Sequence, residues 1–341
     1  MQIELPISKS IANRWLILQA IHGDELMPVS DSMPDDVQLL HRALTTLHNP
    51  TQSYTTLHLS NCGTAMRFLT AYCAQLEGQT TILAGVERMH HRPIGQLVDA
   101  LREIGAQIDY LGEDGFPPLR IKGCVLDKHR IVTIHNPQST QFVSALLLIG
   151  ANVQTDNTSP YITLTRELIQ QYTTLHHSTQ RYTIEKDWSS AAFWYEYVAL
   201  HGGEIELPGL YKDSLQGDKV VADIFAHLGV HTEYNAEGIV IYSSPLHSTP
   251  YTLHQDFASC PDLYPAIALT CERLGVTLHA TGVESLPLKE SDRLRAVAEH
   301  RTDADHRMAM ALLIAGYEVE DTACISKSYP QFIEQFRQLQ S

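Results

Sequence analysis

The chain has 341 residues, of which 44% are hydrophobic and 18% charged, so it can bury one large core or two smaller ones. A disordered or fibrous protein is excluded. At about 150 residues per domain, the length favours two domains. The formal net charge of −15 excludes broad electrostatic binding to nucleic acid or to an anionic membrane. Any anionic ligand must therefore be held by a local basic pocket.

The start of the chain and the cysteines predict a soluble cytoplasmic protein. Residues Met1 to Pro6 contain no basic segment followed by an apolar one, and the longest apolar stretch, around Ala145 to Ile149, is too short to span a bilayer. The six cysteines are scattered and form no CxxC pair, so we expect reduced thiols and no zinc site.

Six segments are apolar almost all round at helical length, which predicts helices that are buried on every side. Each follows a short polar cluster, and the clusters recur at intervals of about 45 to 75 residues along the chain. This spacing predicts six copies of one supersecondary unit. The expected helices are Trp15–Ile21, Ala65–Leu76, Phe142–Ala151, Ala191–Leu200, Tyr264–Cys271 and Met308–Ala315.

Second elements of the repeat are visible in two units. Residues 98–110 and 221–234 both show an amphipathic helix, a glycine at its end and the start of a strand. Each is followed by a hairpin-like stretch, at 115–123 and 238–244. The fifth unit departs from this pattern, because residues 295–300 run directly into 301–306. Either this chain lacks a hairpin there, or residues of the natural chain are missing at the junction.

The polar clusters suit anion binding, because helix N-termini present unpaired N–H groups and the positive end of the dipole. Ordinary capping by Ser, Thr, Asn and Asp explains them equally well taken singly. Asp262 and Glu290 are candidates for proton transfer, although residues 289–293 could also form a solvated charged helix face. Basic residues beside the helix starts favour a ligand: Lys9, Arg14, Arg67, Arg92, Lys289, Arg293, Arg307 and Lys327.

Seven motifs, in family order, resemble the EPSP synthase branch of the enolpyruvyl transferases. They are Ser8–Arg14, Asn61–Arg67, Arg88–Gly95, Ser139–Gln141, Lys289–Leu294, Asp305–Met310 and Ser326–Pro330. The resemblance implies an α/β (α+β) fold of two domains, each with three βαβαββ-type units, and an active site in the interdomain cleft. By the same likeness, residues 1–8 and 235–341 would form domain I, and residues 9–234 would form domain II.

The activity implied by the resemblance is transfer of the enolpyruvyl group of phosphoenolpyruvate to the 5-hydroxyl of shikimate 3-phosphate, without metal or organic cofactor, by a monomer. The implied proton-transfer residues are Asp262 and Glu290, assisted by Lys9 and Lys327. Shikimate 3-phosphate would be held by Lys9, Ser10, Arg14, Ser139, Thr140, Gln141, Ser178, Tyr182, Asp262 and Lys289. Phosphoenolpyruvate would be held by Lys9, Gly63, Arg92, Gln141, Arg293, Arg307 and Lys327.

Four residues depart from the family pattern. Ile7, Phe68 and Ser285 replace a usual Gly, Pro and Asn, and Thr140 replaces a usual Ser but keeps the hydroxyl. Two alternatives therefore stay open. One is a noncatalytic relative that binds substrate without turning it over. The other is the sister transferase that acts on a UDP-amino sugar, although that enzyme lacks the Ser-Thr-Gln cluster and usually has a loop cysteine with no clear counterpart here.

Overall fold

Contacts within the computed structural model divide the chain into two compact units. The model describes residues 1–48, 53–176, 182–244 and 252–340. The N-terminal unit comprises Ser10–Ser30 and Asp36–Tyr182, and the C-terminal unit comprises Met1–Lys9, Asp31–Asp35 and Thr183–Ser341. Among the described residues, no helix is long and apolar enough to cross a membrane.

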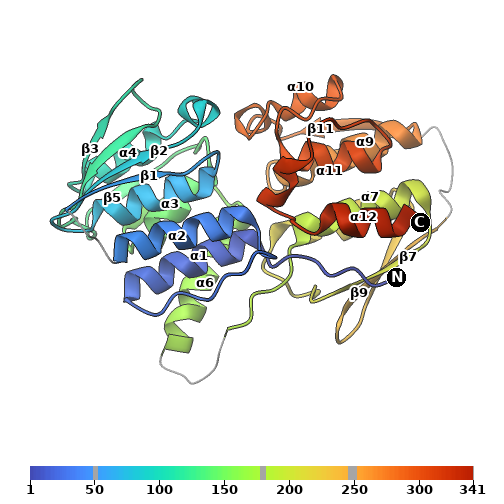
Figure 1. Cartoon of the computed structure of the whole chain (residues 1–341), viewed down its shortest axis with the longest axis horizontal. Coiled ribbons are helices and arrows are strands. Elements are labelled where there is room, and N and C mark those ends of the chain that lie inside the picture. Colours follow the sequence, from blue (N-terminus) through green and yellow to red (C-terminus); the bar gives the residue numbers. More distant parts are fainter. Residues whose placement is uncertain (49–52, 177–181, 245–251, 341) are drawn as a thin grey trace. The chain divides into compact units, whose positions relative to one another are not determined.

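The N-terminal unit contains the first three buried helices, α1 (Lys9–His22), α3 (Gly63–Ala74) and α5 (Thr140–Leu148), with α2 (Asp35–His48), α4 (Gly95–Glu103) and α6 (Pro160–His176) (Figure 1). Its larger sheet has the order β1-β2-β4-β3, from Tyr54–His58, Thr80–Ala84, Leu119–Lys122 and Gln107–Tyr110. β1 and β2 are parallel, whereas β4 is antiparallel to both its neighbours. A second sheet pairs β5 (Ile131–Thr133) with β6 (Asn152–Gln154) in parallel.

The C-terminal unit is built around α7 (Trp188–His201), α9 (Tyr264–Leu274) and α11 (His306–Ile314), which pack against one another (Figure 1). β7 (Glu204–Pro208), β9 (Gly238–Ser243) and β8 (Val230–Tyr234) form an antiparallel sheet after α7, with α8 (Val221–Ala226) before β8. A parallel pair, β10 (Thr252–Asp256) and β11 (Thr277–Thr281), flanks α9. α10 (Arg293–Ala298) and α12 (Phe332–Gln340) complete the unit.

The six predicted buried helices are present, and capping explains the polar clusters in several of them. The stretches 115–123 and 238–244, which were expected to be hairpin-like, each supply one strand, β4 and β9, that forms a hairpin with the preceding strand. Ser139, Asp187 and Asp305 each accept a hydrogen bond from a backbone N–H in the first turn of α5, α7 and α11. The Cys62 thiol does the same for α3. All six cysteines are free thiols, as expected.

The expected return of the chain to the second domain at 234/235 is wrong, because the contacts place it between Tyr182 and Thr183. The cause is that α7 and the sheet β7-β9-β8 share one hydrophobic core with α9 and α11. If each domain holds three repeats, the chain must pass to the second domain before the fourth buried helix, which is α7. The N-terminal segment does lie with the C-terminal unit, where Gln2 bridges Glu206 and Ile7 bridges Lys186.

One buried acid lies in the core of the C-terminal unit with no partner among the described residues. Glu196, on α7, is 0% exposed, and neither of its carboxyl oxygens has a hydrogen-bond partner there. Burial raises the pKa of Glu196 well above its ordinary value of 4.5. The folded protein therefore keeps this proton at a pH where the unfolded chain has lost it.

We expect Glu196 to lower the free energy of unfolding as pH rises. Above pH 4.5 the loss should be about 1.4 kcal/mol per pH unit, until the folded-state pKa is reached. Glu196→Gln should remove this slope, whereas Glu206→Gln, at an exposed position on β7, should leave it unchanged. Urea unfolding of the three proteins across a pH series measures the effect. Parallel pH curves for wild type and Glu196→Gln would contradict it.

Candidate active site

The C-terminal unit holds seven charged side chains in one network, here called the charge cluster. They come from η3 (Pro261–Leu263), from the segment before α10, from the starts of α10 and α11 and from η5 (Ala323–Lys327). Short connections into buried helices place these side chains together. The charge cluster comprises Asp262, Lys289, Glu290, Arg293, Asp305, Arg307 and Lys327.

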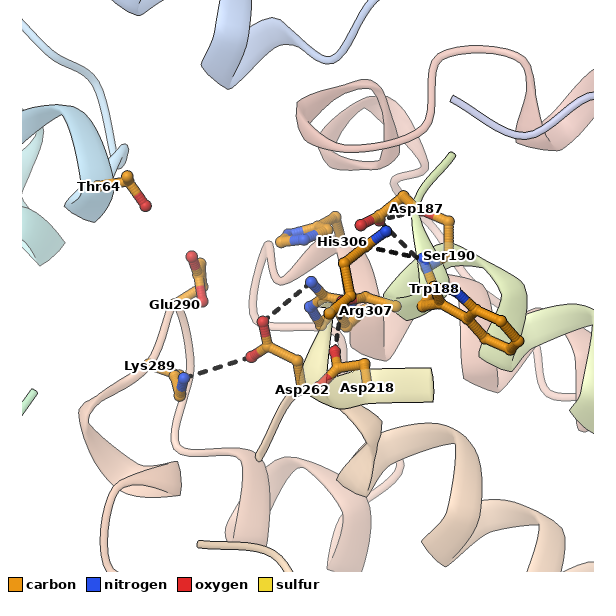
Figure 2. Close-up of polar contacts among 12 residues, drawn as sticks. Thr64, Asp187, Trp188, Ser190, Asp218, Asp262, Lys289, Glu290, His306 and Arg307 are labelled. Atoms are coloured by element: carbon orange, nitrogen blue, oxygen red, sulfur yellow. Dashed lines mark hydrogen bonds and ion pairs between the residues drawn. The ribbon is translucent and has the colours of Figure 1, made fainter. Parts of the chain in front are cut away.

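Asp262 is the centre of this network and accepts hydrogen bonds from three cations. Figure 2 labels two of them, Lys289 and Arg307. Asp262 Oδ1 lies 2.7 Å from Arg293 Nη1 and 3.3 Å from Lys289 Nζ, and Asp262 Oδ2 lies 3.0 Å from Arg307 Nη2. Burial alone would raise the pKa of Asp262, but the charges of Arg307, Lys289 and Arg293 outweigh burial and hold the pKa well below its ordinary value. Asp262 is therefore an ionised carboxylate.

Glu290 bridges two cations of the charge cluster. Its Oε1 lies 2.9 Å from Lys327 Nζ, and its Oε2 lies 3.2 Å from Arg293 Nη2. The side chains of Glu290 and Lys327 are 10% and 13% exposed. Burial lowers the pKa of Lys289 despite its contact with Asp262. A cation of this kind can gain a second anionic partner when a ligand arrives.

Arg293 forms a buried ion pair with Asp305, which sequence reasoning did not include in the site. Asp305 is 0% exposed, and its Oδ2 accepts hydrogen bonds from Arg293 Nε at 2.9 Å and from Ser291 Oγ at 3.2 Å. Its Oδ1 accepts from the backbone N–H of Arg307 at 2.9 Å and so caps α11. One carboxylate thus fixes one arginine directly and the helix start that carries the other. The sequence signal that could have identified Asp305 is its position as the first residue of the Asp305–Met310 motif.

Further acids lie near Arg307 on the first turns of other elements. Asp187 caps α7 through Ser190, as Figure 2 shows, and Asp218 accepts from Ser189. Burial and the charge of Asp262 raise the pKa of Asp218 to about 6. His306 is 1% exposed, and neither ring nitrogen has a hydrogen-bond partner in the described part of the chain. Burial and nearby cations hold the pKa of His306 well below its ordinary value, so the ring is neutral.

A polar network anchors the segment that carries Lys9. Ser8 Oγ donates to Gln216 Oε1 at 2.8 Å, and Gln216 Nε2 donates to Glu185 Oε2 at 2.9 Å. Backbone hydrogen bonds from Ser8 to Glu185 and from Asp187 to Pro6 join the same two segments. The segments that leave the C-terminal unit after Lys9 and re-enter it at Thr183 are therefore tied together inside that unit. Lys9, the first residue of α1, follows directly from this anchor.

The N-terminal unit holds a second group of polar residues at the starts of α3 and α5. Arg67 Nη1 donates to Gln141 Oε1 at 2.7 Å, and Gln141 Nε2 donates to Thr64 Oγ1 at 2.9 Å. Arg92 Nη1 donates to the backbone oxygen of Asn61 at 3.1 Å. A Cβ on Gly63 would lie 2.7 Å from Arg92 Nη2 and 2.8 Å from Arg67 Nη1. Only glycine lets both guanidinium groups approach this helix start so closely.

Arg14 lies deeper in the same unit. It is 2% exposed and donates to Thr165 Oγ1 at 2.7 Å and to Ser144 Oγ at 3.2 Å. Burial lowers the pKa of Arg14 to about 10. Its guanidinium carbon lies 5.4 Å from the centre of the Phe68 ring, a cation–π distance. Phe68, the residue of α3 that departs from the family pattern, therefore packs against Arg14.

The structure places the remaining sequence-predicted site residues as follows. Ser10 accepts from Arg14 through its backbone oxygen, and the Tyr182 ring stacks on Trp15 at 4.0 Å. Ser139 and Thr140 form the start of α5, while Ser178 lies outside the described residues. Across residues 1–48, 53–176, 182–244 and 252–340, no three His, Cys, Asp or Glu side chains could hold a metal ion.

Comparisons with known proteins point to one family. The sequence model of the family EPSP synthase (3-phosphoshikimate 1-carboxyvinyltransferase) matches residues 1–301 and 297–336. The 3-phosphoshikimate 1-carboxyvinyltransferase of Bacteroides fragilis is 36% identical, covering 98% of this chain and 94% of its own. That of Vibrio cholerae is 30% identical, covering 99% and 96%. An EPSP synthase structure from Acinetobacter baumannii, at 19% identity, has the same fold with a TM-score of 0.67, covering 99% and 95%.

Proposed function

Because this chain belongs to the EPSP synthase (3-phosphoshikimate 1-carboxyvinyltransferase) family, we propose that it transfers the enolpyruvyl group of phosphoenolpyruvate to the 5-hydroxyl of shikimate 3-phosphate. The products are 5-enolpyruvylshikimate 3-phosphate and inorganic phosphate. The observation that carries the proposal is the charge cluster, in which Asp262 and Glu290 lie among four cations. Two carboxylates supply acid–base chemistry, and the cations suit two anionic substrates.

Asp262 is the residue we assign as the base. Its ionised carboxylate takes the proton of the 5-hydroxyl as that oxygen bonds to C2 of phosphoenolpyruvate, while Glu290 gives a proton to the methylene carbon. The resulting tetrahedral adduct then loses phosphate, and the methyl group returns a proton to Glu290, so that the enol ether forms. Lys9 and Lys327 assist these transfers. Arg293, Arg307 and Lys289 stabilise the negative charge of the adduct and of the leaving phosphate.

The N-terminal unit contributes the remaining binding residues in this proposal. Shikimate 3-phosphate contacts Ser10, Arg14, Tyr182 and the Ser139–Gln141 cluster, together with Ser178. Phosphoenolpyruvate contacts Gly63, Arg92 and Gln141, where the N–H groups of the α3 start and two guanidinium groups converge. The cleft between domains, the cytoplasmic location and the monomeric state that the resemblance implies stay predictions.

The test of the function is phosphate release from phosphoenolpyruvate. Release should require shikimate 3-phosphate and should be abolished when either substrate is omitted. Release with a UDP-amino sugar in its place would favour the sister transferase. Binding of both substrates without release would instead favour the noncatalytic relative, and the short connection at 299–306 would become the first suspect.

Gly63→Ala tests the proposed phosphoenolpyruvate site. The added methyl group must displace Arg92 and Arg67, so we expect the KM for phosphoenolpyruvate to rise by about tenfold, because hydrogen bonds to charged groups contribute about 1.5–3 kcal/mol. kcat should change much less. Gly95→Ala is the matched control, since Gly95 also begins a helix and its Cβ would meet nothing closer than 3.4 Å. Equal KM values for the two variants would remove Gly63 from the site.

A further inference from the structure

The fifth repeat of this chain is shorter than the second, and the difference lies in one connection. In the second repeat, α4 leads into β3 and β4. In the fifth repeat α10 stands in the place of α4, but residues 299–305 lead from it directly into α11. All residues of this connection are described, and none belongs to a strand. The two matches of the family model also meet here, at residues 297–301. The 299–305 connection is therefore a feature in which this chain departs from the family model.

The first half of the connection is a Schellman motif that ends α10. The N–H of Arg301 donates to the carbonyl oxygen of Ala296 at 2.9 Å, and the N–H of His300 donates to that of Val297 at 3.3 Å. His300 has a φ of 52°, in the left-handed region where this motif usually places glycine. A residue with a Cβ is strained in this conformation and keeps it only where its surroundings hold it. The contacts that hold His300 must therefore come from its side chain and its neighbours.

The side chain of His300 makes such contacts with two residues of other segments. Its Nε2 lies 2.9 Å from Glu272 Oε1 on α9, and its ring stacks on that of Tyr317, after α11, with ring centres 4.1 Å apart. The Tyr317 hydroxyl donates to the same carboxylate. Burial alone would raise the pKa of Glu272, but hydrogen bonds from Tyr317 and His300 outweigh burial and lower the pKa. These three residues, here called the His300 cluster, fasten the start of the connection to α9 and to the end of α11.

The second half of the connection ends at Asp305. The Asp305 N–H donates to the carbonyl oxygen of Thr302 at 2.8 Å, which closes a turn. Asp303 and Ala304, the central residues of this turn, have φ values of 45° and 57°, as in a type I′ turn, which favours glycine and asparagine. Since Asp305 holds Arg293 and caps α11, this second strained turn leads directly into the carboxylate that orders the charge cluster.

We propose that His300 is a positioning residue for the transferase reaction, acting through the 299–305 connection on Asp305. This role rests on the proposed function, because it concerns the arginines that stabilise the adduct. The His300 cluster holds one end of the connection, and the other end sets the Asp305 carboxylate against Arg293 and against the N–H of Arg307. When the ring is lost, the strained turns relax and Asp305 shifts. Both arginines then lose their fixed places in the charge cluster.

His300→Asn tests the proposal, because asparagine accepts the left-handed conformation but has no ring to stack on Tyr317. The kcat for phosphate release should fall by about ten- to a hundredfold, since a misplacement of about 1 Å that begins far from the reacting atoms can cost a hundredfold. The free energy of unfolding in urea should change little. Tyr317→Leu should lower kcat in the same way. A variant with both substitutions should be no slower than the slower single variant, because each removes the same cluster.

His231→Asn is the matched control. The His231 ring also lies against a tyrosine, Tyr242, with ring centres 5.6 Å apart, and the Tyr242 hydroxyl also donates to a glutamate, Glu233. These residues lie on β8 and β9, which carry no member of the charge cluster. The kcat of His231→Asn should equal that of the wild type.

Amide hydrogen exchange at residues 305–310 separates the role of His300 from the proposed function. Exchange should be faster in His300→Asn than in the wild type and unchanged in His231→Asn, whether or not substrate is turned over. A wild type that releases no phosphate would overturn the proposed function, and exchange would then decide whether His300 fixes Asp305. An active wild type, with His300→Asn unchanged in kcat and in exchange, would overturn the role of His300 alone. So would a fall in kcat without faster exchange, or losses that multiply in the double variant.

Discussion

Glu290→Gln is expected to lower kcat by about 10²- to 10⁴-fold, the usual contribution of one general acid or base. The amide keeps the size of the side chain, and its oxygen can still accept from Lys327 or Arg293, at 2.9 Å and 3.2 Å in the native cluster. It cannot deliver and recover a proton. The KM values for both substrates should therefore change much less than kcat. Steady-state phosphate release, measured with each substrate in turn at saturation, gives the two constants separately.

Glu284→Gln is the control for this result. It removes the same charge from an exposed position six residues earlier in the chain. Its kcat should equal that of the wild type. If Glu290→Gln raises both KM values and leaves kcat unchanged, Glu290 serves in binding and the assignment of proton transfer is wrong. If it changes neither, Glu290 does not touch the reacting atoms, and Asp262 alone would be left for acid–base chemistry.

Much of the fold was predictable because the repeat has a strong local signal. A helix that is apolar on every side, entered through Ser, Asn or Asp and followed by glycine, is defined by its own residues. α7, for example, is capped by Asp187 and ends at Gly202, which has a φ of 75°. The boundary between units was not predictable in this way. It depends on which core α7 joins, and that is decided by packing against α9 and α11.

The candidate site was likewise predictable where its residues share one motif, and not predictable where it depends on contacts between distant parts of the chain. Lys289, Glu290 and Arg293 share one motif, so their proximity was expected, and the structure adds Asp262, Arg307 and Lys327 to the same network. The side chains that sequence reasoning missed are those that hold others in place. Gln216 contacts Ser8, which lies 208 positions earlier in the chain, and Glu185, which lies 31 positions earlier. No local pattern encodes such a contact.

Asp305→Ala is expected to cost about 3–5 kcal/mol of the free energy of unfolding and to abolish most activity. The substitution removes a fully buried carboxylate and leaves Arg293, itself 1% exposed, without one of its buried partners. It also removes the cap of α11, and so loosens the backbone that carries Arg307. Chemical denaturation measures the first effect, and phosphate release at saturating substrates measures the second.

Asp292→Ala separates the two contributions of Asp305. Asp292 is also an N-cap aspartate, for α10, and its Oδ1 accepts from the backbone N–H of Arg295 at 3.2 Å. Its loss should cost only about 1 kcal/mol, the usual value of a cap. A similar cost for Asp305→Ala would mean that the carboxylate matters as a cap and that Arg293 does not need it. A much larger cost, with activity lost even where the variant is fully folded, would establish Asp305 as the residue that positions both arginines of the charge cluster.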